Sequence, residues 1–165
     1  MKISQKLLTR WAIESQKPPK LTERQWNNVG LLGIVFLVMA VLQVWSFSVF
    51  KDWLTATGIS GASSWAVIII LVEVLAATGL FKIGLSYMTR VITAAAVVLA
   101  SGFWFIETVR LISGSYLDTL KNSGYLGRFL QQTPGWWTIV EATILLAWSM
   151  YAIDLLKDEL SPKNK

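Results

Sequence analysis

The chain contains no cysteine and no histidine among its 165 residues. Without cysteine there is no disulfide, no thiol redox chemistry and no thiolate metal ligand. Without histidine there is no Ser-His-Asp triad and no histidine-ligated haem or zinc. We therefore expect no metal site, no catalytic residue set, and no cofactor bound covalently or through histidine or cysteine. Any chemistry is left to carboxylates, Arg, Lys, hydroxyl groups, Tyr and Trp.

Charge is also scarce. Charged residues make up 15% of the chain and hydrophobic residues 54%, whereas soluble domains carry about 25% charged residues. This is too little charge to cover a water-facing surface. The net charge is +5, but the basic residues sit between apolar runs and form no single patch. We interpret them as determinants of membrane topology and expect no nucleic acid partner.

Four apolar segments are long enough to cross a bilayer, which takes roughly 20 residues in a helix. Each is apolar nearly all round, and in lipid the backbone polar groups must be satisfied within the segment. The sequence therefore predicts an all-α integral membrane four-helix bundle within residues 27–155. The expected spans are about Val29–Val49, Ser64–Phe81, Val91–Ile112 and Trp136–Ile153.

The segments outside the bundle are short. Residues 1–26 form an N-terminal tail whose residues 3–15 place apolar side chains on one helical face. This pattern indicates an amphipathic helix that lies on the membrane surface or docks on a partner subunit. The loop 113–135 is long for a helical connection, and we expect one or two short helices there, resting on the bundle as a lid. Residues 156–165 form a C-terminal tail.

The distribution of Lys and Arg predicts the orientation. Eleven of the fifteen lie in the two tails and in the loop between the second and third spans. The positive-inside rule then places both termini in the cytoplasm, in a protein integral to the cell (inner) membrane. Six tryptophans fall near the opposite interface, as in an aromatic belt: Trp45, Trp53, Trp65, Trp104, Trp136 and Trp137.

A few polar residues interrupt the spans, all toward the outer half of the membrane. A charged side chain at the bilayer centre costs on the order of 2.5–3.5 kcal/mol, so these residues should face inward and share partners. They are Gln43, Glu73, Glu107, Arg110 and Glu141. Glu107 and Arg110 are i,i+3 neighbours that can pair. One Arg cannot neutralise three glutamates, so either another cation joins or one Glu is protonated, with the deepest, Glu73, as the candidate.

Two interpretations of this set stay open. It could form a site that opens to the outer face and binds a quinone head group, a small polar ligand or a proton. It could equally form an interhelical hydrogen-bond network that fixes the helix register.

Residues 73–84, with the Thr89-Arg90 and Ala94-Ala95 pairs, resemble the DoxX-like family of four-helix membrane proteins. The resemblance lies in a Glu in the second span, a Gly-Leu pair, a Gly at the cytoplasmic end, and a Thr-Arg that opens an Ala-rich third span. It implies a four-helix bundle. It also implies a role like that of family members, which include a membrane subunit of thiosulfate:quinone oxidoreductase and accessory partners of redox enzymes. Related members often rely on cysteines, which this chain lacks, so a thiol relay is not expected.

These features favour a small non-catalytic membrane subunit or accessory protein of a larger membrane complex of the respiratory or redox type. Its partners would be the lipid bilayer and other membrane subunits, or further copies of the chain. One alternative is a quinone-interacting subunit of a DoxX-like oxidoreductase, with quinone or lipid as its bound molecule. A second is a small oligomeric carrier or proton-coupled transporter.

Overall fold

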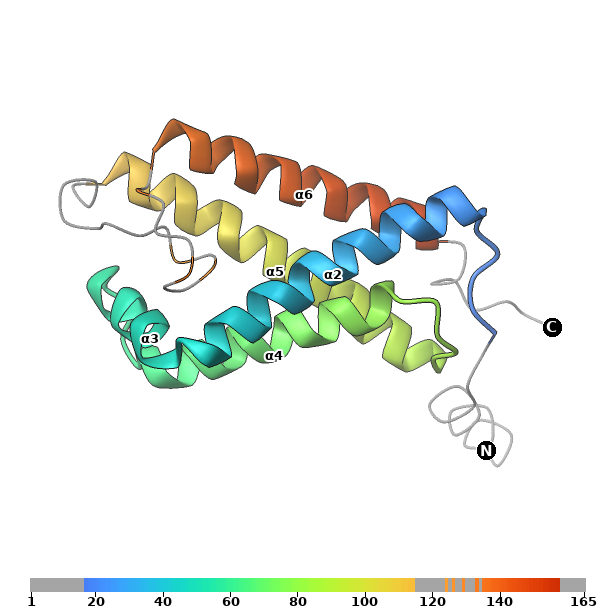
Figure 1. The fold of residues 1–165 in the computed structure, drawn as a ribbon, viewed down its shortest axis with the longest axis horizontal. Coiled ribbons are helices and arrows are strands. Elements are labelled where there is room, and N and C mark those ends of the chain that lie inside the picture. The colour runs from blue at the N-terminus through green and yellow to red at the C-terminus, as the bar shows by residue number, and fades with distance from the viewer. Residues whose placement is uncertain are drawn as a thin grey trace, which may run out of the picture.

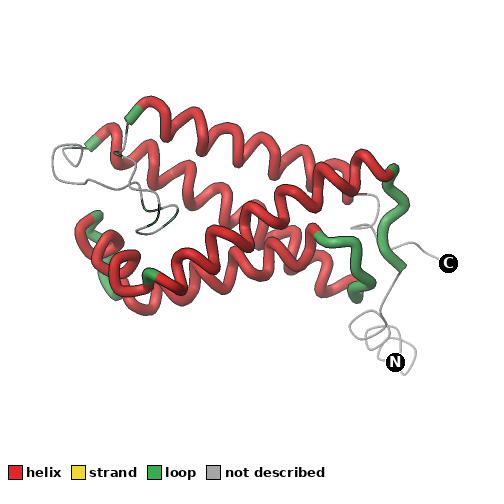
Figure 2. Tube along the Cα trace, viewed as in Figure 1, coloured by secondary structure: helices red, strands yellow, loops and turns green. Residues whose placement is uncertain are grey.

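The computed structural model describes residues 17–114, 124, 126, 129, 133 and 135–157. These residues form five helices and no strand (Figures 1 and 2). The helices are α2 (Glu23–Trp45), α3 (Phe47–Ala56), α4 (Ala62–Leu80), α5 (Tyr87–Ser113) and α6 (Trp136–Leu156). The predicted helix over 3–15 and most of the predicted lid over 113–135 lie outside the described residues.

Four of the helices, α2, α4, α5 and α6, are long and apolar enough to cross a membrane. This confirms the predicted all-α four-helix membrane bundle. The four run alternately up and down (Figure 1). Helix α2 packs on α4, α4 on α5, and α5 on α6, while α2 and α6 touch less extensively. One end of the bundle carries α3, and we call it the α3 end; the opposite end, where α2 begins and α6 finishes, is the terminal end.

Helix α2 differs from the first predicted span, about Val29–Val49, at both ends. Helix α2 begins earlier, at Glu23, where the Thr22 side chain and the Gln25 side chain form a capping box. It ends at Trp45, because Ser46 leaves the helical conformation at φ −114° and ψ 37°. The Ser46 hydroxyl donates to the Leu42 carbonyl four residues earlier at 2.7 Å, a side-chain bond that bends helices.

Helix α3 therefore replaces the end of the expected first span. It buries Phe50, Trp53 and Leu54 and packs on α4. Gln43, just before the break, reaches Glu73, which lies about 16 Å along α4 from Ala62 at 1.5 Å per residue. Helix α2 thus stops well short of the start of α4, and α3 covers the remaining part of α4 at this end.

Helices α4 and α5 approach closely near the terminal end. A methyl group at Gly79 of α4 would overlap the Cβ and Oγ1 atoms of Thr93 on α5. Gly79 is therefore the residue that permits this spacing, as small residues do at membrane helix interfaces. At the same end Arg90 is buried and donates to the carbonyl of Lys17, and Trp148 of α6 donates to the Asn28 side chain of α2 at 2.7 Å.

Candidate functional site

Glu73 is completely buried near the middle of the bundle. Its Oε1 atom accepts two hydrogen bonds, from Gln43 Nε2 on α2 at 3.1 Å and from Trp104 Nε1 on α5 at 2.7 Å. Both donors are also fully buried. We call these three residues the Glu73 cluster. Each comes from a different helix, so a single carboxyl oxygen links α2, α4 and α5.

Aromatic rings cover the Glu73 cluster on the side of α3. Trp104 packs against Trp53 and Phe50 of α3, with ring centroids 5.7 and 6.2 Å apart. Trp53 and Phe50 stack on one another at 6.1 Å. Gly124 is buried and lies against Trp53, because a Cβ built on Gly124 would be 2.6 Å from the Trp53 indole. These three rings, the aromatic layer, exclude water from the carboxyl of Glu73.

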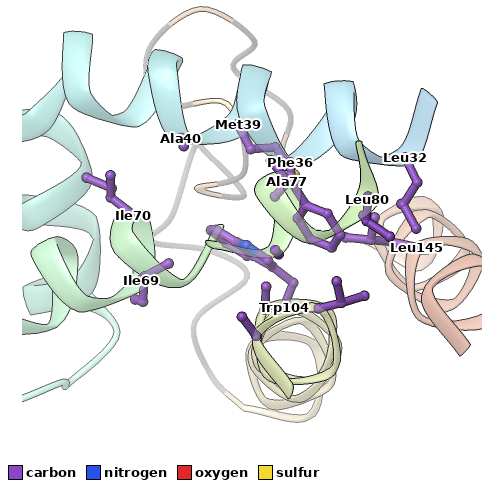
Figure 3. Close-up of a cluster of buried hydrophobic side chains, with 14 of the residues drawn as sticks. Leu32, Phe36, Met39, Ala40, Ile69, Ile70, Ala77, Leu80, Trp104 and Leu145 are labelled. Atoms are coloured by element: carbon purple, nitrogen blue, oxygen red, sulfur yellow. The ribbon is translucent and has the colours of Figure 1, made fainter. Parts of the chain in front are cut away.

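The interfacial assignment of two tryptophans is wrong. Trp104 has an exposed fraction of 0% and Trp53 of 5%, so neither belongs to an aromatic belt. Figure 3 shows Trp104 projecting from α5 into the core that α2 and α4 close from the other side. The indole is held inside because its N–H has an acceptor, Glu73, that a buried tryptophan needs. The other four tryptophans are exposed as the belt requires: Trp45, Trp65, Trp136 and Trp137.

Glu107 and Arg110 form a second, separate group, closer to the α3 end. Arg110 pairs with Glu107 at 2.9 Å, as the i,i+3 spacing predicts, and it donates to the backbone carbonyl of Thr57 at 2.6 Å. Thr57 follows the last residue of α3, so Arg110 caps a helix C-terminus, where a cation is favourable. We call Thr57, Glu107 and Arg110 the Arg110 cluster. It fastens α3 to α5.

The structure thus divides the five predicted residues. Gln43 and Glu73 meet, Glu107 and Arg110 meet, and Glu141 is half-buried on α6. The two hydrogen bonds to Glu73 come from α2 and α5, and Arg110 contacts Glu107 and the Thr57 carbonyl. None of these contacts involves α6. Glu73 has only neutral N–H donors as partners among the described residues, so its assignment as the protonated acid stays a prediction.

Two members of these clusters escaped the sequence interpretation. Trp104 was assigned to the interface by its position in the span, yet it lies three residues before Glu107 on the same face of α5. That spacing was the available signal. No sequence pattern indicates the contact of the Thr57 carbonyl with Arg110, because that contact depends on the helix break at Ser46.

The arrangement has clear chemical limits. Among the described residues no group of three or more acidic side chains could hold a metal ion. Glu73, the most strongly buried acid among the described residues, is enclosed by the Gln43 amide and the aromatic layer. What this geometry accomplishes directly is to fix the positions of α2, α3, α4 and α5 relative to one another. Comparison of the chain with models of protein families, with curated proteins and with solved structures finds no match.

The Arg110 cluster makes a testable prediction about α3. In Arg110→Ala the Thr57 carbonyl loses its donor and Glu107 its cation, so α3 should separate more readily from α5. Because Lys51 lies within α3, we expect tryptic cleavage after Lys51 to accelerate about tenfold in detergent, which corresponds to roughly 1.4 kcal/mol of lost local stability.

The control is Glu107→Gln, which leaves Arg110 and its bond to the Thr57 carbonyl in place. It should accelerate cleavage much less. Equal acceleration in the two variants would show that Arg110 without its Glu107 partner does not hold α3.

Proposed function

We propose that the chain is a small, non-catalytic membrane subunit or accessory protein of a larger membrane complex. The observation that carries this proposal is the use made of the intramembrane polar groups. In both clusters hydrogen bonds join different helices of the same bundle. Buried polar groups used in this way specify how helices meet, and they are not arranged around a space where a substrate could react.

The exterior of α6 supports a role in assembly. Only α5 packs extensively on α6 among the described helices, and α6 has the smallest buried share of the four spans. Its exposed side chains include five large hydrophobic ones: Trp136, Trp137, Ile144, Met150 and Tyr151. We propose that this face meets another membrane subunit or a further copy of the chain, with lipid covering what stays free.

The proposed location is the cell (inner) membrane with both termini in the cytoplasm. Support comes from the bundle, which brings the start of α2, the loop between α4 and α5, and the end of α6 to one end (Figure 1). The described basic residues of the positive-inside argument belong to that end: Lys17, Lys20, Arg24, Lys82, Arg90 and Lys157. The Arg110 cluster and α3 would then lie toward the outer face.

One feature favours the quinone-interacting alternative. The second carboxyl oxygen of Glu73, Oε2, is buried and has no hydrogen-bond partner among the described residues, and such a group is costly to leave unpaired. The hydroxyl of a quinol, the reduced form of a quinone, would satisfy Oε2 by donating one hydrogen bond to it. To enter, the quinol would have to displace part of the aromatic layer. Membership of the DoxX-like family stays a prediction.

The test is to purify the tagged full-length chain in mild detergent and to compare it with Glu73→Gln. Proteins that accompany the chain at fixed stoichiometry would define the parent complex. Glu73→Gln keeps the size and the acceptor oxygen but replaces Oε2, which has no partner among the described residues, with an amide N–H₂ that can only donate. We expect less assembled complex and unchanged activity per assembled complex.

The matched control is Glu23→Gln, the same chemical change at an exposed residue in the first turn of α2. It should leave the amount of assembled complex unaltered. An intact yield of Glu73→Gln complex that has lost its activity would favour the ligand site instead.

A further inference from the structure

An apolar groove of about 340 Å³ lies between α4 and α5 on the surface of the bundle. Trp65 and Val72 mark its ends on α4, and Val98 and Ile106 mark its ends on α5. Every residue that lines it is hydrophobic or glycine. The groove is separate from both polar clusters.

The absence of a side chain at Gly102 leaves the groove open. A Cβ built on Gly102 would meet no other atom within 4 Å, whereas the same atom on Gly79 would overlap Thr93. Gly102 is therefore not required for close packing of α4 on α5. A glycine at position 102 instead leaves space in the groove beside Phe103 and Ala100.

The groove faces the interior of the membrane. Both helices that form it are candidate spans, and two lining side chains, Leu99 and Ile106, are 64% and 63% exposed. Because the lining is apolar, a water molecule in the groove would find no hydrogen-bond partners among the lining side chains. An occupant must come from the hydrocarbon layer.

Size distinguishes a hydrocarbon chain from a helix. The α4 side of the groove, Trp65 to Val72, extends over about 10.5 Å of helix rise. A helix about 10 Å wide would take up roughly 800 Å³ over that length, more than twice the available volume. A narrow, flexible chain fits the space, and a second copy of the protein could offer only single side chains to it.

We propose that the groove is a binding site for one acyl chain of a membrane phospholipid. The chain lies against Leu99 and Ile106 and over Gly102, and is held by dispersion contacts with the walls. Phe103 lines the groove and packs edge-on against Trp104, with ring centroids 5.2 Å apart. This proposal is independent of the accessory role, because it concerns the surface of the bundle and not its assembly with other proteins.

The experiment uses the full-length protein in bilayers of phosphatidylcholine that carries a photoreactive diazirine in one acyl chain. After illumination, mass spectrometry of peptides locates the adducts. We expect them to concentrate on the segments 65–72 and 98–106. In Gly102→Leu, whose side chain fills the groove, labelling of these segments should fall by at least about fivefold. Gly102→Ala should give a smaller decrease.

The matched control is Gly30→Leu on α2, where a Cβ also meets no atom within 4 Å. It should leave labelling of the groove segments unchanged. Thermal unfolding of each variant verifies that the fold is intact, and if Gly102→Leu fails to fold, Gly102→Ala decides. Uniform labelling of all four spans that ignores substitution at Gly102 would mean unspecific boundary lipid and overturn the proposal. A change of oligomeric state in Gly102→Leu without lipid adducts would overturn it in favour of a second copy.

Discussion

Trp104→Ala is expected to lower the free energy of unfolding by about 3–5 kcal/mol, the usual cost of removing a large aromatic side chain from a packed core. Trp104 is fully buried and contacts both rings of α3 in the aromatic layer. Its removal leaves a cavity between α3 and α5 and takes one of two donors from Glu73. The cavity and the lost hydrogen bond act in the same direction.

Thermal unfolding of the purified chain in detergent measures this effect. A loss of 3–5 kcal/mol corresponds to a fall in Tm of roughly 6–20 °C for a chain of this size. Trp104→Phe keeps most of the ring and removes only the N–H donor, so it should cost about 1–3 kcal/mol. Trp65→Ala, at a half-exposed tryptophan of α4, is the control and should change Tm little. Equal shifts for Trp65→Ala and Trp104→Ala would contradict the burial described for Trp104.

Gly79→Ala is expected to destabilise the bundle by about 1–3 kcal/mol, although alanine is the better helix former by about 1 kcal/mol. The added methyl would overlap the Cβ and Oγ1 of Thr93. Thr93 is buried and branches at Cβ, so it cannot rotate away from the overlap. Helices α4 and α5 must therefore move apart.

Gly30→Ala is the matched control, because a Cβ at Gly30 meets no atom. It should leave Tm equal or slightly raised. The double variant Gly79→Ala/Thr93→Gly removes the overlapping atoms and should recover part of the lost stability, as a double-mutant cycle would show. Simple additivity of the two single changes would show that these residues do not meet.

The sequence predicted the fold well where one strong pattern sufficed. Long apolar runs in lipid leave the backbone no alternative to helix, so the existence of α2, α4, α5 and α6 followed directly. The pairing of Glu107 with Arg110 was also predictable, since their i,i+3 spacing brings them together on any helix.

Other features depend on contacts between helices that no local pattern specifies. The break at Ser46 falls inside a mostly apolar run, and its side-chain bond to Leu42 competes only weakly with the helix. Once α3 folds back, Trp53 becomes a core residue and the Thr57 carbonyl reaches Arg110. Position along the span suggested an interfacial Trp104, but rotation of α5 about its axis turns that indole toward Glu73.

In the proposed function, Glu73 holds helices together and does not act on a ligand. The most direct test is the activity per assembled complex of the Glu73→Gln variant, with the amount of complex measured on the same sample. We expect a reduced amount of complex whose activity per complex equals that of the unaltered protein. A normal amount of complex with its activity reduced tenfold or more, about 1.4 kcal/mol in the activation free energy, would contradict this expectation.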